Sequence, residues 1–175
     1  MKKIVLVFGL ISGALMALFM FATMPFIDKI GLDKGYLVGY TSMVLAFMLV
    51  FFGIRSYREN VGGGAITFGR AFAVGILIAV ISSVCYVIAW EILYFNFMPD
   101  FMDKYAAHVI EKARAAGASA QQIQAQTQEL EQFKQMYNHN LLINFAFTFI
   151  EPLPVGLIIT LISAAILRKK KRIEY

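Results

Sequence analysis

Two glutamates stand inside long apolar runs, where an ionisable side chain is costly and therefore suggests a function. Glu91 lies near the end of the run at 71–93, and Glu151 lies within the run at 141–167. Two carboxylates held close together repel each other unless a proton or a cation lies between them. The chemistry that this pattern suggests is the binding or transport of protons or cations.

The distance from flanking basic residues places the two carboxylates at similar depths. Glu91 comes after Arg70 in the sequence, and Glu151 comes before Arg168. At ~1.5 Å per residue of helix, these separations correspond to about 31 Å and about 25 Å. They would share a cavity if their helices are neighbours. The alternatives are that Glu91 reaches interfacial water and that Glu151 caps a helix restarting after it.

Pro152 and Pro154 follow Glu151 closely and belong to the same candidate intramembrane site. A proline has no N–H, so it leaves a carbonyl one turn earlier without its donor. Broken helices of this kind form ion sites in transporters. Trp90, beside Glu91, is interpreted as an interfacial anchor.

The composition favours a lipid environment over a soluble fold. Of the 175 residues, 59% are hydrophobic and 15% are charged, whereas about a quarter are charged in a typical soluble domain. A helix of roughly 20 apolar residues crosses a bilayer, and the runs at 4–27, 36–54, 71–93 and 141–167 approach or exceed that length. We therefore expect one all-α, polytopic membrane domain, residues 1–175, with four transmembrane helices.

Basic residues are unevenly divided between the two ends of this predicted bundle. Ten of the sixteen lie at the N-terminus, between the second and third spans, and in the tail. Basic residues favour cytoplasmic segments, so both termini are expected in the cytoplasm. The tail cluster is expected to contact lipid headgroups, and it consists of Arg168, Lys169, Lys170, Lys171 and Arg172. Because this charge adjoins an apolar run, membrane lipids are the expected partners and a nucleic acid is not.

Residues 99–140 form the one long polar connection and are predicted to be an extracytoplasmic helical hairpin between the third and fourth transmembrane helices. Gly117 is a plausible residue after the first helix, and Ser119 with Gln122 has the capping-box pattern that begins a second helix. The apolar stripes of the two helices either pack within the protein or bind a membrane protein partner. The candidate partner-binding residues are Phe101, Tyr105 and Phe133.

Other patterns carry weaker signals. Gly9 and Gly13 form a GxxxG motif, which permits close helix contact within the bundle or in a homo-oligomer. Cys85 lies in an apolar run with no base nearby in the sequence, and the two histidines have no metal-ligand spacing. The sequence therefore predicts no enzymatic activity, no catalytic residue, no metal and no cofactor.

Several blocks of the chain resemble the domain of unknown function 4199 family. They are Arg-Ser-Tyr-Arg-Glu-Asn at 55–60, the glycine-rich block at 62–72, Tyr-x-x-x-Trp-Glu at 86–91, the block at 99–105 and Glu-Pro-x-Pro-Val-Gly at 151–156. The resemblance implies a small four-helix protein of the bacterial inner membrane, of the kind found in Bacteroidota. It implies no activity and no catalytic residue.

Two functional hypotheses follow. The first is a structural or accessory membrane protein whose outer hairpin is the interaction surface. The second is a small oligomeric transporter or channel that uses Glu91 and Glu151 for protons or cations, because four helices rarely enclose a solute path alone. The first is the preferred interpretation.

Overall fold

The structure is a computed structural model, and it describes residues 1–169. Within that range the chain consists of helices joined by short links, with one isolated bridge between Ile66 and Lys169. The helices, in chain order, are α1 (Lys2–Thr23), η1 (Met24–Phe26), α2 (Ile27–Ile30), α3 (Leu32–Asn60), α4 (Phe68–Phe97), α5 (Phe101–Ala115), α6 (Ala120–His139), α7 (Leu141–Ile150) and α8 (Leu153–Leu167). The all-α prediction is confirmed.

Four helical stretches are long and apolar enough to cross a membrane. They are Lys2–Ile30, Leu32–Asn60, Phe68–Phe97 and Leu141–Leu167. In such a stretch each backbone N–H and C=O must be bonded within the protein, which a helix does by itself. The second and third helices extend beyond the predicted spans at 36–54 and 71–93, because α3 continues through polar residues to Asn60 and α4 begins at Phe68 after the Thr67 cap.

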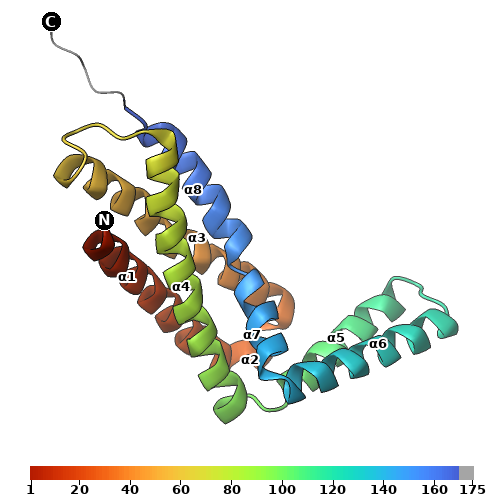
Figure 1. Cartoon of the computed structure of the whole chain (residues 1–175). Coiled ribbons are helices and arrows are strands. Elements are labelled where there is room, and N and C mark those ends of the chain that lie inside the picture. The colour runs from red at the N-terminus through yellow and green to blue at the C-terminus, as the bar shows by residue number, and fades with distance from the viewer. Residues whose placement is uncertain (170–175) are drawn as a thin grey trace, which may run out of the picture.

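The four long stretches form a bundle, and the α5–α6 pair extends from one end of it (Figure 1). α1 and α8 each pack against both α3 and α4. The N-terminus, the α3–α4 link and the end of α8 gather at the opposite end (Figure 1). There the Lys169 N–H donates to the Ile66 carbonyl at 2.9 Å, and the Lys169 carbonyl accepts from the Ile66 N–H at 3.0 Å. Lys170, Lys171 and Arg172 of the predicted lipid-binding cluster lie outside the described residues.

Small residues let α1 approach α4 closely. A Cβ added to Gly13 would lie 2.4 Å from the Cβ of Cys85, and one added to Gly9 would lie 2.8 Å from Ile81. Buried Ser82 joins the same contact by donating to the Gly9 carbonyl at 3.1 Å. The GxxxG motif thus serves packing within the chain.

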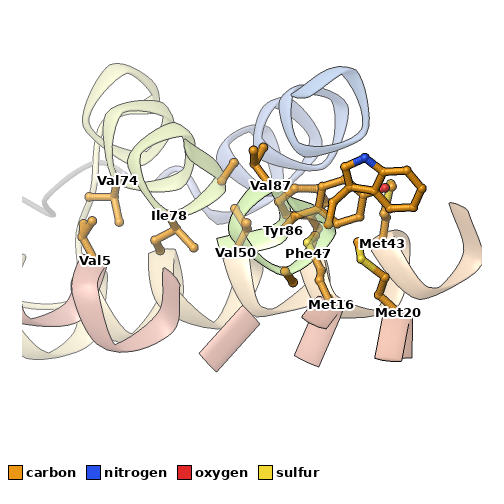
Figure 2. Close-up of a cluster of buried hydrophobic side chains, with 14 of the residues drawn as sticks. Val5, Met16, Met20, Met43, Phe47, Val50, Val74, Ile78, Tyr86 and Val87 are labelled. Atoms are coloured by element: carbon orange, nitrogen blue, oxygen red, sulfur yellow. The ribbon is translucent and has the colours of Figure 1, made fainter. Parts of the chain in front are cut away.

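The buried core changes in character along the bundle. Figure 2 shows Val5, Val74 and Ile78 towards one end of the cluster, with Met16, Met20, Met43 and Tyr86 towards the other. The aliphatic part includes fully enclosed side chains of α3 and α4, among them Val50, Val74 and Ile78. The part made of methionines and aromatic rings leads towards the α5–α6 pair.

Local signals fix the α5–α6 pair. Gly117 has φ +82° after α5, a conformation that glycine adopts without strain. Ser119 and Gln122 form the complete capping box at the start of α6. At the far end of α6, the Asn140 side chain accepts from the backbone N–H groups of Leu142 and Ile143, which starts α7.

Candidate functional site

A cavity of about 330 Å³ lies where the α5–α6 pair meets the bundle. α3 packs against α4 and α8, whereas within residues 1–169 it is not among the close neighbours of α7. The cavity lies where α3 and α7 are separated, and its walls come from η1, α2, α3, α4, α5, α6 and α7. It is therefore a shared product of the bundle and the α5–α6 pair.

Residues spaced four apart build most of the wall. Each of four helices supplies one pair, and a fifth pair joins α7 to the residue that follows it; such a pair lies on one helical face. The pairs are Tyr36 and Tyr40, Tyr86 and Trp90, Phe101 and Tyr105, Phe133 and Tyr137, and Phe147 and Glu151. Nine of these ten side chains are aromatic, so the wall consists mainly of ring surfaces with one carboxylate among them.

Glu151 lines this cavity from the break between α7 and α8. The Tyr86 hydroxyl donates to its Oε2 at 2.9 Å. No side-chain bond from Glu151 caps α8, whose N-cap is the buried Pro152. Because Pro152 has no N–H, the carbonyl of Thr148 lacks its usual helical donor, and Thr148 also lines the cavity. The break between α7 and α8 thus lies at the cavity, where both Thr148 and Glu151 contribute to the wall.

A buried hydrogen-bond chain joins α4, α6 and α7 beside the cavity. The Trp90 Nε1–H donates to the Tyr137 hydroxyl at 2.8 Å, and that hydroxyl lies 2.9 Å from Thr148 Oγ1. Burial raises the pKa of Tyr137; its bonds with Thr148 and Trp90 lower it, and the charges of Glu91 and Glu151 raise it. Both carboxylates are therefore within electrostatic reach of this one hydroxyl.

Glu91 occupies a different environment from Glu151. It is absent from the cavity wall as residues 1–169 define it. Both of its carboxylate oxygens are enclosed and have no hydrogen-bond partner in that range. α4 is a neighbour of both α7 and α8, so the assumed adjacency of the helices holds. Only one of the two glutamates, however, faces the cavity.

The three hairpin residues predicted to bind a partner lie in the wall beside Glu151. Phe101, Tyr105 and Phe133 are partly buried and pack against the core. The ring of Phe101 meets Trp90 edge-on, with centroids 4.9 Å apart, and Phe133 meets Phe147 at 5.1 Å. The two candidate sites that the sequence separated, one in the membrane and one on the hairpin, therefore meet in one place.

The remaining predicted residues lie elsewhere. Pro154 is exposed in the first turn of α8. Arg168 and Lys169 lie at the opposite end of the bundle, where Arg58 donates to the Leu167 carbonyl at 3.4 Å. In the part of the chain that the structure describes, no three His, Cys, Asp or Glu side chains group as metal ligands would.

Sequence reasoning missed most of the aromatic wall. It treated Trp90 as an interfacial anchor, placed Tyr137 in the apolar stripe of the second hairpin helix, and gave Tyr36, Tyr40 and Tyr86 no role in a site. The signal that identifies them is the repeated spacing of four between aromatic residues on successive helices. One such pair is ordinary in a membrane helix, so only the convergence of several pairs gives them meaning.

The fold and the cavity define a class: a small all-helical protein with four helices suited to a membrane and an aromatic cavity beneath an added helix pair. Residues 7–169 match the family described as "Protein of unknown function (DUF4199)", and the chain belongs to that family. No curated protein and no solved structure matches the chain.

Proposed function

We propose that this is an accessory, non-enzymatic protein of the bacterial inner membrane that binds a partner where its hairpin meets the bundle. The hairpin is the α5–α6 pair, and it lies outside the cytoplasm, with both termini inside. The observation that carries the proposal is the shared cavity: Phe101, Tyr105 and Phe133 of the hairpin and Glu151 of the bundle line one space. A concave, largely apolar site with few polar groups is typical of ligand binding.

The hairpin's fastening to the bundle supports this location. Lys104 of α5 forms an ion pair with Asp28 of α2 at 2.7 Å. Lys112 pairs with Asp33 of α3. The Tyr94 hydroxyl donates to the side-chain carbonyl of Asn138, joining α4 to α6. These contacts to three parts of the bundle, two at the root of the hairpin and one in the last turn of α5, hold the hairpin over the cavity, so the hairpin acts as its cover.

Cysteine labelling tests the proposed topology. In a Cys85→Ala background, a cysteine at Gln124 in α6 should react with a membrane-impermeant maleimide in intact cells, after outer-membrane permeabilisation where one is present. A cysteine at Gly63 in the α3–α4 link should react only after the inner membrane is opened. The reverse pattern would place the hairpin in the cytoplasm and overturn this part of the proposal.

Cation or proton transport is the second candidate function, and Glu91 is the observation that favours it. A carboxylate with two enclosed, unpaired oxygens is unstable as an ion unless something binds it. Binding is preferred because Phe47, Val50 and Ile78, all fully buried, fill the bundle on the side of the cavity towards the termini. In the described residues, the cavity is therefore closed on this side by apolar side chains, as expected for a binding pocket and not for a transport path.

Flux through proteoliposomes separates the two functions. We expect wild type and a Glu91→Gln, Glu151→Gln double variant to show the same background flux of protons and monovalent cations. A wild-type flux that the double variant loses, with folding intact by circular dichroism, would establish transport and refute the binding function as the principal one.

A further inference from the structure

We propose that the cavity binds an organic ammonium ion carried on an apolar body, with Glu151 as the counter-ion and the aromatic rings as the wall. This inference rests on the proposed binding function and names the class of ligand. Its three supports are the charge of the wall, its ring surfaces and its lateral opening.

The wall carries one charged side chain, and that side chain is acidic. Among the lining residues found in 1–169, Glu151 is the sole ionisable residue other than tyrosines, and none is basic. The nearby lysines of the hairpin are already paired: Lys104 with Asp28 and Asp100, Lys112 with Asp33, and Lys134 with Asp103. Charge complementarity with an ionised Glu151 therefore favours a positive ligand.

The carboxylate has hydrogen-bonding capacity to offer such a ligand. Its Oε2 accepts from Tyr86. Within residues 1–169, no hydrogen bond or ion pair reaches Oε1, and that atom is not among the fully enclosed ones. The tyrosine thus fixes the orientation of the carboxylate and leaves one oxygen accessible from the cavity.

The aromatic wall selects an organic cation over an inorganic one. A bare Ca²⁺ or Mg²⁺ ion requires six or more oxygen ligands, whereas this wall presents one carboxylate and scattered hydroxyls. Ring faces attract alkylated ammonium groups through their quadrupole, and cages of such rings recognise them in other proteins. Tyr36, Tyr86, Trp90 and Tyr105 supply electron-rich rings from three different helices.

The opening between α3 and α7 accommodates the apolar body. Tyr40 on α3 and Phe147 on α7 line the cavity and yet are 45% and 52% exposed. Both lie within the stretches suited to a membrane. A ligand whose ammonium group meets Glu151 can therefore extend its apolar part sideways past these rings. A lipid with an amine headgroup and a free amphiphilic amine share this chemistry.

The only tryptophan of the chain reports directly on occupancy. Trp90 is the single tryptophan, and it lines the cavity. Phenethylammonium is the cationic probe, and 2-phenylethanol is its uncharged counterpart of similar size. Each is titrated against the full chain in phospholipid-free detergent micelles while the Trp90 emission is recorded.

We expect phenethylammonium to change the Trp90 emission saturably and to bind at least about tenfold more tightly than 2-phenylethanol. Glu151→Gln should remove that preference. It should lower the affinity for phenethylammonium about tenfold and leave the affinity for 2-phenylethanol unchanged. Glu91→Gln is the matched control, because it removes a neighbouring carboxylate that lies outside the cavity wall. It should keep the wild-type preference.

Two results would overturn the inference, and they are distinguishable. If both probes saturate with equal affinity, or if Glu151→Gln keeps the preference, the cavity binds ligands but not as an ammonium site. If neither probe changes the emission of a folded protein, the binding function itself fails. Circular dichroism of each variant establishes that it is folded.

A lipid arm distinguishes the two sources of the ammonium group. The titration is repeated in nanodiscs of phosphatidylethanolamine and in nanodiscs of phosphatidylglycerol. Phenethylammonium affinity lowered only in phosphatidylethanolamine assigns the site to the lipid amine, since the lipid competes for it. Equal affinity in both assigns it to a free amine.

Discussion

The two ends of the bundle are built on different principles. Towards the termini, α1, α3, α4 and α8 meet through glycine contacts and fully buried aliphatic side chains such as Val50, Val74 and Ile78. Towards the hairpin, a cavity of about 330 Å³ with an aromatic wall and a carboxylate lies between α3, α4, α7 and the hairpin. Well-filled interiors give stability, whereas clefts with few polar groups bind ligands. Under the proposed binding function, one end of the bundle holds the fold and the other binds the ligand.

The largest effect is expected from replacing a glycine in the tightly packed part of the bundle with a larger residue. Gly13→Leu should lower the free energy of unfolding by about 3 kcal/mol or more, since overpacking a tight contact displaces backbone. Its added Cβ alone would lie 2.4 Å from the Cβ of Cys85 and 3.3 Å from the Cα of Ser82. Chemical unfolding in mixed micelles measures the change.

Gly39→Ala is the matched control at the cavity end. A Cβ added there meets nothing within 4 Å. Alanine favours helix over glycine by about 1 kcal/mol, so this variant should be as stable as wild type or slightly more stable. Equal destabilisation by both substitutions would contradict the contrast between a filled and an open end.

A smaller effect is expected from the hydrogen bonds beside the cavity. Tyr137→Phe leaves the buried Trp90 N–H and Thr148 hydroxyl without the partner they share. Leaving a buried donor unpaired costs about 1–3 kcal/mol, and thermal unfolding should show the loss. Tyr105→Phe is the comparison, because within residues 1–169 no hydrogen bond is found to its hydroxyl. Equal stability of the two variants would show that the chain of bonds contributes nothing.

The smallest effect is expected from the ion pairs that fasten the hairpin. Lys104→Gln removes bonds to Asp28 and Asp100 on an exposed surface, where such pairs contribute little and are screened by salt. We expect faster hydrogen exchange in α5 at low salt with no change in global unfolding. Lys34→Gln is the control, since no ion pair of Lys34 is found in residues 1–169. Unchanged hydrogen exchange in α5 would show that these ion pairs do not hold the hairpin to the bundle.

The same fastening sets a pH dependence. The Lys104 ammonium lowers the pKa of Asp100, and bonds to Asp28 and Asp100 raise the pKa of Lys104. The Asp100 contribution is complete above its unfolded pKa of about 3.9 and is lost as the pH falls through the folded value. The Lys104 contribution is lost only as the pH rises through its raised value. The protection of the α5 amides, which is their exchange rate relative to the intrinsic rate at the same pH, should therefore fall in acid and in strong alkali and stay constant near neutral pH.

The sequence predicts the helices of this fold better than it predicts the site. Apolar runs and cap residues such as Ser119 and Gly117 act locally, so they fix the helices without knowledge of their neighbours. Helix bounds were less predictable, since α3 and α4 continue past the apolar runs into polar residues. Extension beyond the membrane depends on caps and packing, which hydropathy does not describe.

The site depends on contacts between helices far apart in the sequence. Depth along a helix placed Glu91 and Glu151 at similar heights, but the rotation of each helix decides which side chain faces the cavity. Glu151 faces it, and in the described part of the chain Glu91 does not. Likewise, the apolar stripe of α5 does not reveal that Phe101 meets Trp90 of α4. The spacing of residues within one helix predicts which side chains share a face of that helix. Only the packing of α4, α6 and α7 shows which residues that face contacts.

The measurement that tests the central claim most directly is the quenching of Trp90 by a nitroxide on the hairpin. The label is attached at Tyr105→Cys or at Gln124→Cys in a Cys85→Ala background, with the protein in lipid nanodiscs. If the hairpin's root closes the cavity, the label at 105 quenches Trp90 strongly, because position 105 shares the cavity wall with it, and the label at 124 quenches it weakly. Equal, weak quenching from both positions would mean that the hairpin stands away from the bundle, and the single site described by Glu151 and the hairpin's aromatic residues would not exist.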